Sequence, residues 1–182
     1  YEFADITASA INWHSGRDWC IDNSSGSPSD DSKIQLWTCG AEKSSQKWAF
    51  LPDFTIRLGS DLNKCLHLSG ANASNNTNIQ LTNCNGSGAQ KWIFEGTSRM
   101  IRYHDDLGFC LTMDKHDASN SSNIYLYECS TGNLGQQWNR ADFSAAYTSS
   151  STVKSIRPDY ATAKAFDKTG VNAENAKIWL WD

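Results

Sequence analysis

The sequence repeats itself every 45 residues. Five apolar or cysteine positions of the first copy return at this spacing in two later copies: Ile11, Cys20, Ile34, Leu36 and Cys39, then Ile56, Cys65, Ile79, Leu81 and Cys84, then Ile101, Cys110, Ile124, Leu126 and Cys129. A repeat of this length is one supersecondary unit that cannot bury its apolar face alone. The chain is therefore expected to fold by closing three units on each other, at about residues 9–50, 54–94 and 99–140.

Each unit contains four short segments of β type, separated by turns rich in Gly, Asn, Ser and Asp. In the second unit these segments are residues 55–58, 64–68, 78–82 and 90–94. Three such units give twelve short strands without a helical period. This pattern predicts an all-β closed arrangement with a pseudo-threefold axis, and closure also removes most exposed strand edges.

The six cysteines fall two to a unit, 19 positions apart. Six cysteines can pair in many ways, but the repeat makes one disulfide in each unit the simplest choice, namely Cys20–Cys39, Cys65–Cys84 and Cys110–Cys129. Disulfides imply an oxidising compartment. Because the chain also opens at Tyr1 without Met or an apolar leader, we expect a processed, secreted protein.

Composition excludes several classes of function. The formal charge is −4 and no Lys/Arg cluster is present, so nucleic acid is not an expected partner. The sequence has no apolar run of about 18 residues, which argues against membrane insertion. Its four histidines lack metal-ligand spacing and no nucleophile context is visible, so neither catalysis nor a metal or other cofactor is expected.

Five Asn-x-Ser/Thr sequons lie in Ser/Asn/Gly-rich loop sequence. On a secreted eukaryotic protein they would carry N-linked glycans. The predicted glycosylation sites are Asn23, Asn72, Asn75, Asn85 and Asn120.

Strand alternation assigns side chains to the two faces of each strand. The Ile and Leu that recur in the third strand of each unit point to the core, so Gln35 and Trp37 point outward in the first unit. The disulfide places Asp22 on the same side. Asp22, Gln35 and Trp37 are therefore expected to converge on a shallow surface patch.

The last strand of each unit carries Gln-x-Trp, in phase with the cysteines. The three copies are Gln46-Lys47-Trp48, Gln90-Lys91-Trp92 and Gln136-Gln137-Trp138. Each Trp is best used to fill the core, and each Gln amide can bind backbone groups that the closing strand leaves unpaired. These residues indicate the fold rather than the function.

Together these motifs resemble the ricin B-type β-trefoil lectins, whose units read C-[VIL]-D, then [VI]-Q-L-W-x-C, then Q-x-W. The first unit carries all three, as Cys20-Ile21-Asp22, Ile34-Gln35-Leu36-Trp37-Thr38-Cys39 and Gln46-Lys47-Trp48. The resemblance covers about residues 3–140 and implies a β-trefoil that binds sugars without catalysis. It also implies galactose or N-acetylgalactosamine as the ligand, because the Asp of this family selects the axial hydroxyl.

The first unit is the main candidate for a sugar site. Trp37 would stack on the C–H face of a pyranose, and the Asp22 carboxylate would accept strong charge-assisted bonds from two adjacent hydroxyls. Gln35, Ser45 and Gln46 would add polar contacts, although the family has Asn where this chain has Ser45. A glycan on the neighbouring Asn23 would crowd this site.

The other two units depart from the binding motif. The second has His67 in place of the Asp and Thr82 in place of the aromatic residue, and it is interpreted as structural. The third keeps aromatic residues but has no Asp at the matching position. It is a weak third site made of Thr112, Asp114, Tyr125 and Tyr127.

A partial fourth repeat follows a linker at residues 141–155. In residues 156–182, Asp167 matches Asp22, and Trp179 and Trp181 match Gln35 and Trp37. These residues form a possible second sugar site. Because Tyr1-Glu2-Phe3 stands in the register of a closing strand, we expect the two termini to pair, within one chain or across a homodimer.

The sequence thus favours a secreted lectin for galactose-type glycans on glycoproteins or glycolipids. One alternative is a carbohydrate-targeting module released from a larger glycoside hydrolase or toxin. Another is a trefoil that serves as a protein–protein scaffold, such as an inhibitor.

Overall fold

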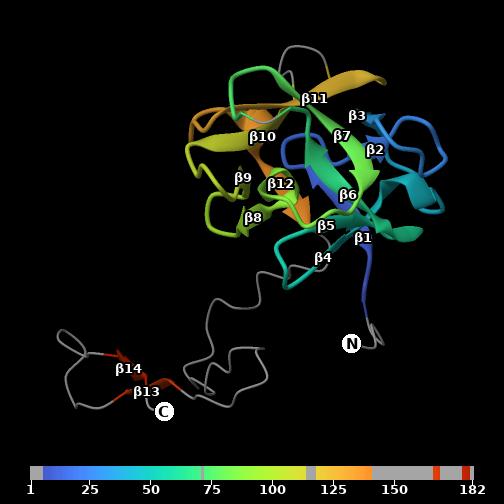
Figure 1. Ribbon diagram of the computed structural model, residues 1–182. Helices are drawn as coiled ribbons and strands as arrows, with labels where there is room; N and C mark the ends of the chain where they lie inside the picture. The colour runs from blue at the N-terminus through green and yellow to red at the C-terminus, as the bar shows by residue number, and fades with distance from the viewer. Residues whose placement is uncertain (1–5, 71, 114–117, 141–165, 169–177, 181–182) are drawn as a thin grey trace. The chain divides into compact units, whose positions relative to one another are not determined.

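The computed structural model describes residues 6–70, 72–113, 118–140, 166–168 and 178–180 (Figure 1). The chain divides into two units, Tyr1–Ser144 and Ala145–Asp182. The described part of the first contains twelve strands: β1 (Ser9–Trp13), β2 (Trp19–Asn23), β3 (Ser32–Thr38), β4 (Lys47–Phe50), β5 (Ile56–Leu58), β6 (Asp61–Leu68), β7 (Thr77–Asn83), β8 (Trp92–Glu95), β9 (Met100–Tyr103), β10 (Phe109–Met113), β11 (Ser122–Glu128) and β12 (Trp138–Arg140). The predicted count of four strands in each repeat is confirmed.

Six of these strands close into a barrel. Strand β1 pairs with β4 and β12, β4 pairs with β5, and β8 pairs with β9. The two remaining seams are closed by the backbone N–H groups of Trp92 and Trp138, which donate to Phe54 O and Arg99 O, each at 2.8 Å. A closed ring leaves the barrel no unpaired edge.

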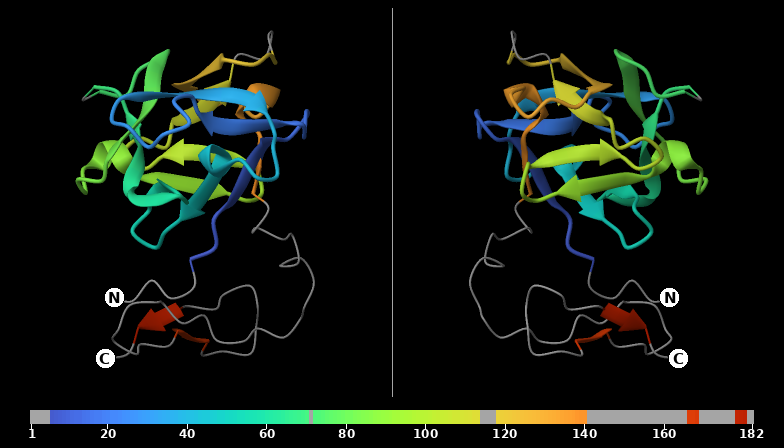
Figure 2. Two further views of the ribbon diagram at one scale, coloured as in Figure 1. Left: turned by 90° about the vertical axis from the view of Figure 1, so that its right-hand side faces the viewer. Right: turned by 90° about the vertical axis from the view of Figure 1, so that its left-hand side faces the viewer.

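The other six strands form three hairpins at one end of the barrel, opposite the end where β1 enters (Figures 1 and 2). The hairpins are β2–β3, β6–β7 and β10–β11, and β3, β7 and β11 also pair with one another. This arrangement is the predicted β-trefoil. The three predicted disulfides are also present, each between cysteines 19 residues apart.

The tryptophan of each Gln-x-Trp motif fills the core and also makes one hydrogen bond there. All three indoles are at least 98% buried. Each indole N–H donates at 3.0 Å to a backbone carbonyl in the second strand of its own repeat: Trp48 to Ile21 O, Trp92 to Leu66 O and Trp138 to Leu111 O. A buried indole N–H without a partner would be costly, so these bonds fix the closing strand against the hairpin.

The glutamines of the same motifs are fully buried and bind the backbone, as predicted. Each amide oxygen accepts a backbone N–H, from Gly40, Asn85 and Ser130 at 2.8, 2.8 and 2.7 Å. Each amide nitrogen donates to a carbonyl at the end of the third strand, of Thr38, Asn83 and Glu128 at 3.1, 2.9 and 2.8 Å. The prediction that Gln90 belongs to a strand is wrong, because Gln90 ends the 3-10 turn η2 (Gly88–Gln90) and β8 starts at Trp92.

A ring of polar contacts joins each repeat to the next. A side-chain oxygen from the loop of one repeat accepts a backbone N–H at the end of the neighbour's third strand. The three contacts are Asp30 with Asn83 N at 2.8 Å, Asn75 with Glu128 N at 2.8 Å, and Asn120 with Thr38 N at 2.9 Å. All six residues lie at the 45-residue spacing, so the threefold pattern of the sequence is also the pattern of these bonds.

The second unit contains one described hairpin, β13 (Phe166–Lys168) and β14 (Ile178–Leu180). Its register pairs Phe166 with Leu180 and Asp167 with Trp179. The β2–β3 hairpin pairs the matching residues in the same way, because Ile21 pairs with Leu36 and Asp22 pairs with Gln35. Trp181, the predicted linker 141–155 and the rest of this unit lie outside the described residues.

We predict that Gln136→Met lowers the free energy of unfolding by about 2–4 kcal/mol, because it removes the buried amide that binds the Ser130 N–H, the Glu128 carbonyl and the buried Thr112 hydroxyl. The control is Gln137→Met, the same change at the next residue, whose amide makes only a long 3.4 Å bond to Thr131 O. Urea denaturation of both variants measures the difference. Equal stability of the two variants would contradict a structural role for the buried amide.

Candidate functional site

A pocket of about 360 Å³ lies beside the β2–β3 hairpin of the first repeat. Strand β2, the loop that follows it, strand β3 and the segment leading into the 3-10 turn η1 (Ser44–Gln46) provide its walls. The lining residues are Asp22, Asn23, Ser24, Gly26, Gln35, Trp37, Glu42, Lys43, Ser44 and Ser45. Four of the five residues predicted to bind sugar, Asp22, Gln35, Trp37 and Ser45, are thus brought together, whereas Gln46 is not among them.

The Asp22 carboxylate is fixed from two sides. Gln35 lies opposite it on the neighbouring strand and donates Nε2–H to Oδ2 at 2.9 Å. Ser45 donates its hydroxyl to Oδ1 at 2.8 Å. Each carboxylate oxygen therefore has one protein donor, and the orientation of Asp22 is set before any ligand binds.

Two residues of the site are more buried than their outward direction on the strands suggests. Asp22 and Gln35 point away from the core, yet they are only 6% and 5% exposed. The loop after β2 lines the same pocket, and Ser45 binds the Asp22 carboxylate directly. Alternation assigned the correct face of the strand but could not show how far these side chains are buried.

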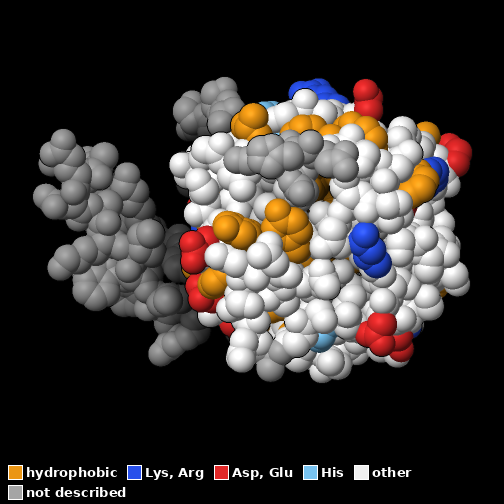
Figure 3. All heavy atoms as spheres, turned by 90° about the horizontal axis from the view of Figure 1, so that it is seen from above, with side chains coloured by type: hydrophobic (Ala, Val, Ile, Leu, Met, Phe, Trp, Pro, Cys, Tyr) orange, Lys and Arg blue, Asp and Glu red, His pale blue; other side chains and the backbone are white. Residues whose placement is uncertain are grey.

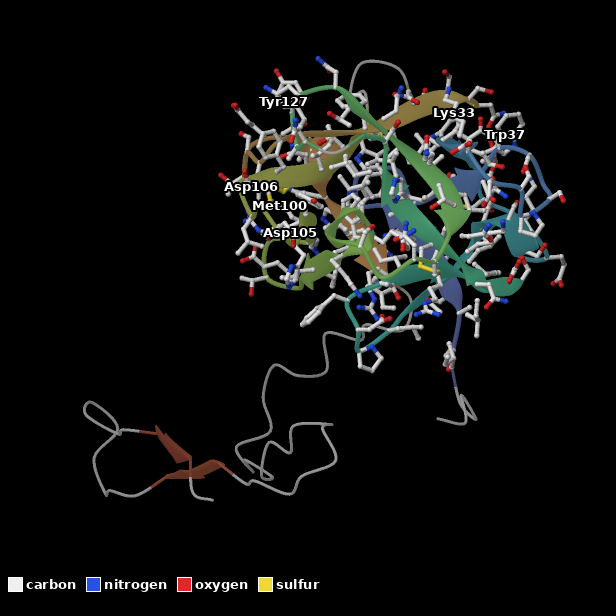
Figure 4. The ribbon with its side chains drawn as sticks, in the orientation of Figure 1. Lys33, Trp37, Met100, Asp105, Asp106 and Tyr127 are labelled. Carbon is white, nitrogen blue, oxygen red and sulfur yellow. A yellow bond between two sulfur atoms is a disulfide. The ribbon has the colours of Figure 1, made fainter. Side chains whose placement is uncertain are left out.

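Trp37 is the partly exposed aromatic residue of the pocket, and Figure 4 shows it at the outer edge of the barrel. The ammonium nitrogen of Lys43 lies over its ring, 5.5 Å from the centroid. Nothing in the repeat pattern predicts this contact, since Lys43 is not a repeated residue.

Gln46 must be corrected as a sugar contact. Its side chain is fully buried, and both its amide groups bind the backbone, at Gly40 N and Thr38 O. Its position serves the fold, as the repeated motif also indicated.

The predicted glycan site at Asn23 is also corrected. Asn23 is 1% exposed, and its Nδ2, the atom that a glycan would modify, donates to Ser27 O at 3.0 Å. A glycan there would break the loop that walls the pocket. The other four sequon asparagines, Asn72, Asn75, Asn85 and Asn120, are exposed.

In the second repeat, His67 and Gln80 occupy the positions of Asp22 and Gln35. Gln80 donates to Asp31 of the first repeat at 2.8 Å, so it supports the base of the neighbouring loop. The His67 Nδ1 atom is buried and has no hydrogen-bond partner among the described residues. Burial lowers the pKa of His67, while the nearby Asp31 carboxylate opposes that change.

In the third repeat, Thr112 replaces the carboxylate and is 2% exposed. Its hydroxyl donates to Cys110 O and accepts from Gln136, each at 2.9 Å, so it is used by the fold. Tyr125 and Tyr127 pack edge to face with centroids 6.2 Å apart. Figure 4 shows Tyr127 and Trp37 on opposite sides of the barrel, and Asp114 lies outside the described residues.

The face at the hairpin end shows isolated basic and acidic groups among uncharged atoms (Figure 3). The described residues contain no group of three or more His, Cys, Asp and Glu that could hold a metal ion. Among them there is also no helix of sufficient length and apolarity to span a membrane.

Comparison with known proteins places these features in a family. A model of the ricin-type β-trefoil lectin domain matches residues 10–138. No curated protein matches the chain by sequence. Similar solved structures include the designed threefold-symmetric protein ThreeFoil, which shares 19% identity over 75% of this chain and 99% of its own, with a TM-score of 0.65.

Two natural proteins are similar at comparable levels. The C-half of the earthworm R-type lectin, solved in complex with GalNAc, shares 18% identity over 74% of this chain and 97% of its own, with a TM-score of 0.58. GalNAc-T7, solved with UDP, GalNAc and Mn²⁺, shares 15% identity over 75% of this chain but only 22% of its own, with a TM-score of 0.59. The structural similarity shows that the fold is shared.

We predict that His67 makes the protein less stable in mild acid. Its pKa in the folded state lies below the ordinary value of 6.5, so the unfolded chain binds more protons, and stability falls as the pH drops from 6.5 through the lowered pKa. His67→Gln removes this loss. Urea denaturation at about pH 7.5 and pH 5.0 should show a smaller drop in unfolding free energy for the variant; an equal drop would contradict the assignment.

Proposed function

Because the chain belongs to the ricin-type β-trefoil lectin family, we propose that its first repeat binds galactose- or N-acetylgalactosamine-type sugars and that it performs no chemistry on them. The observation that carries the proposal is the orientation of Asp22 by Gln35 and Ser45 inside a sugar-sized pocket. An ionised carboxylate has about four lone-pair positions. Two are used by the protein, which leaves two for the adjacent hydroxyls of one pyranose.

Trp37 completes the requirements for a sugar. A pyranose has one weakly apolar C–H face, which stacks on an aromatic ring, and a rim of hydroxyls, which need polar partners. Trp37 lines the same pocket as Asp22 and is partly exposed. The GalNAc complex of the similar earthworm lectin supports galactose-type sugars as the class of ligand.

We predict that Asp22→Asn weakens galactose binding by about tenfold or more, because it replaces charge-assisted hydrogen bonds with neutral ones at nearly constant volume. The matched control is Asp18→Asn, which removes the same charge from an exposed position outside the pocket. Galactose, GalNAc and glucose would be titrated by NMR, with the indole N–H signal of Trp37 as the reporter.

Glucose tests the stereochemistry, since it differs from galactose only in the configuration of the hydroxyl at C4, which is equatorial in glucose and axial in galactose. We expect it to bind more weakly than galactose. If no saccharide binds the native chain, the lectin proposal fails and the scaffold alternative is favoured. If Asp18→Asn is as damaging as Asp22→Asn, the carboxylate is not the specificity contact.

A targeting module within a larger protein is the second candidate function. One observation favours it: the trefoil that resembles this chain in GalNAc-T7 accounts for 22% of that protein's chain. In this reading the pocket would bring a linked catalytic domain to galactose-type glycans. Sugar binding is common to both candidates, and the full reading frame distinguishes them.

We also propose that the protein is secreted and carries N-linked glycans. Three disulfides, with no free cysteine among the described residues, suit an oxidising compartment. The four exposed sequon asparagines are the proposed acceptors, and the buried Asn23 is not. Treatment with an N-glycosidase followed by mass spectrometry identifies the modified asparagines.

Finally, we propose that the termini associate, within one chain or between two. The β13–β14 hairpin repeats the register of β2–β3, and a repeat of this kind also needs a closing strand. We predict that deleting residues 141–182 either reduces solubility or lowers the sedimentation coefficient by more than the loss of 42 residues from one chain would. Unchanged solubility and oligomeric state after the deletion would contradict this proposal.

A further inference from the structure

Gly40 leaves room for the Lys43 stem beside the pocket. A Cβ atom on Gly40 would lie 2.8 Å from Lys43 Cγ and 2.9 Å from Cδ, closer than side chains tolerate. Because Gly40 has no side chain, the Lys43 stem can pass close to the Gly40 backbone. From there the ammonium group extends over the ring of Trp37.

This arrangement occurs in the first repeat alone. Counting back three residues from the buried glutamine of each repeat gives Lys43, Ser87 and Asn133, and the residue after the second cysteine is Gly40, Asn85 or Ser130. The glycine, the lysine and the tryptophan coincide only in the repeat that has the Asp22 pocket. Neither the core nor the barrel closure needs the lysine, because the other repeats close without it.

The ammonium group is the one positive charge among the described residues that line the pocket, and it forms no ion pair with any described residue. Asp22 lies covered and already accepts two hydrogen bonds. Glu42, the other acidic residue of the lining, is exposed, and so is Lys43. Among the lining residues Lys43 is the one that brings a positive charge to the Trp37 side of the pocket.

We propose that Lys43 determines specificity. It selects galactosides that carry an acidic group at a carbon other than the two whose hydroxyls bind Asp22. This inference rests on the proposed function of the same pocket. A neutral sugar must share the Trp37 face with the ammonium group and offers it only hydroxyl oxygens. A sulfate ester or a carboxylate offers it a charge-assisted bond while the sugar ring stays on the indole.

The test compares sugars that differ only in the acidic group. Methyl β-galactoside, its 2-sulfate, its 6-sulfate and the corresponding C6 carboxylate, methyl β-galacturonoside, would be titrated by NMR against the native chain. At least one acidic form should bind about two- to fivefold more tightly than the neutral sugar, as expected for a partly exposed ion pair. The sulfates and the carboxylate separate the two possible sources of the charge.

Three variants then locate the effect. Lys43→Met keeps the apolar stem and should abolish the acidic preference. Lys33→Met removes the same charge from the strand of Trp37, where Lys33 donates to Ser121 O outside the pocket, and should keep the preference. Gly40→Ala retains the lysine but displaces its stem, so it should reduce the preference without changing the net charge.

The outcomes separate this proposal from the one on which it rests. If the neutral galactoside binds and no acidic form binds more tightly, the role of Lys43 is wrong and the lectin function stands. The role is also wrong if the acidic preference survives in Lys43→Met or disappears equally in Lys33→Met. If none of the four sugars binds the native chain, the proposed function itself fails.

Discussion

The structure depends on how each closing strand is fastened to its own hairpin. A buried indole N–H must find an acceptor, and in each repeat the acceptor is the backbone carbonyl that follows the first cysteine, at Ile21, Leu66 and Leu111. The buried glutamine two residues before each tryptophan ends the 3-10 turn that leads into this strand and binds the backbone at and just after the end of the third strand. These contacts recur in all three repeats with nearly equal distances. The closure of the barrel therefore does not depend on what the hairpins carry on their outer faces.

This separation allows the three hairpins to diverge in function. The first keeps the carboxylate and the aromatic ring, and its pocket is walled by the loop after β2. In the second, His67 replaces the carboxylate, and Gln80 turns to Asp31 at the base of that same loop. Asp30 is bound by Lys64 and Asn83 of the second repeat as well. A repeat that has lost the elements of a sugar site thus supports the wall of its neighbour's site.

The repeat made most of the fold predictable, because a period of 45 residues sets the number of units and the face of every repeated residue, and makes one pairing of the cysteines the simplest. Asp22, Gln35, Trp37 and Ser45 were predicted to meet, and they do. The burial of Asp22 and Gln35 was not predictable, since strand alternation gives the face of a side chain and not its exposure. The burial of Asn23 and the position of Lys43 depend on similar local detail, a side chain bonded within its own loop and a glycine that admits a stem. The sequon of Asn23 does not show that its side chain is buried. The sequence distance from Lys43 to Trp37 does not show that the ammonium group lies over the ring.

The burial of Asp22 bears on what the pocket can contribute to recognition. An exposed carboxylate exchanges water for a sugar hydroxyl at little net gain, whereas a covered one is poorly served by water once a ligand fills the pocket. A sugar that lacks a hydroxyl in the right position would then leave a buried charge with fewer hydrogen-bond partners. The binding free energy lost by such a sugar is larger than the free energy gained by a sugar that matches. Asp22 is therefore better suited to selectivity than to strength. Strength must come from the area buried on Trp37 and from groups at the rim, and among the pocket-lining residues Lys43 is the rim group that offers the donor and the charge that Asp22 cannot.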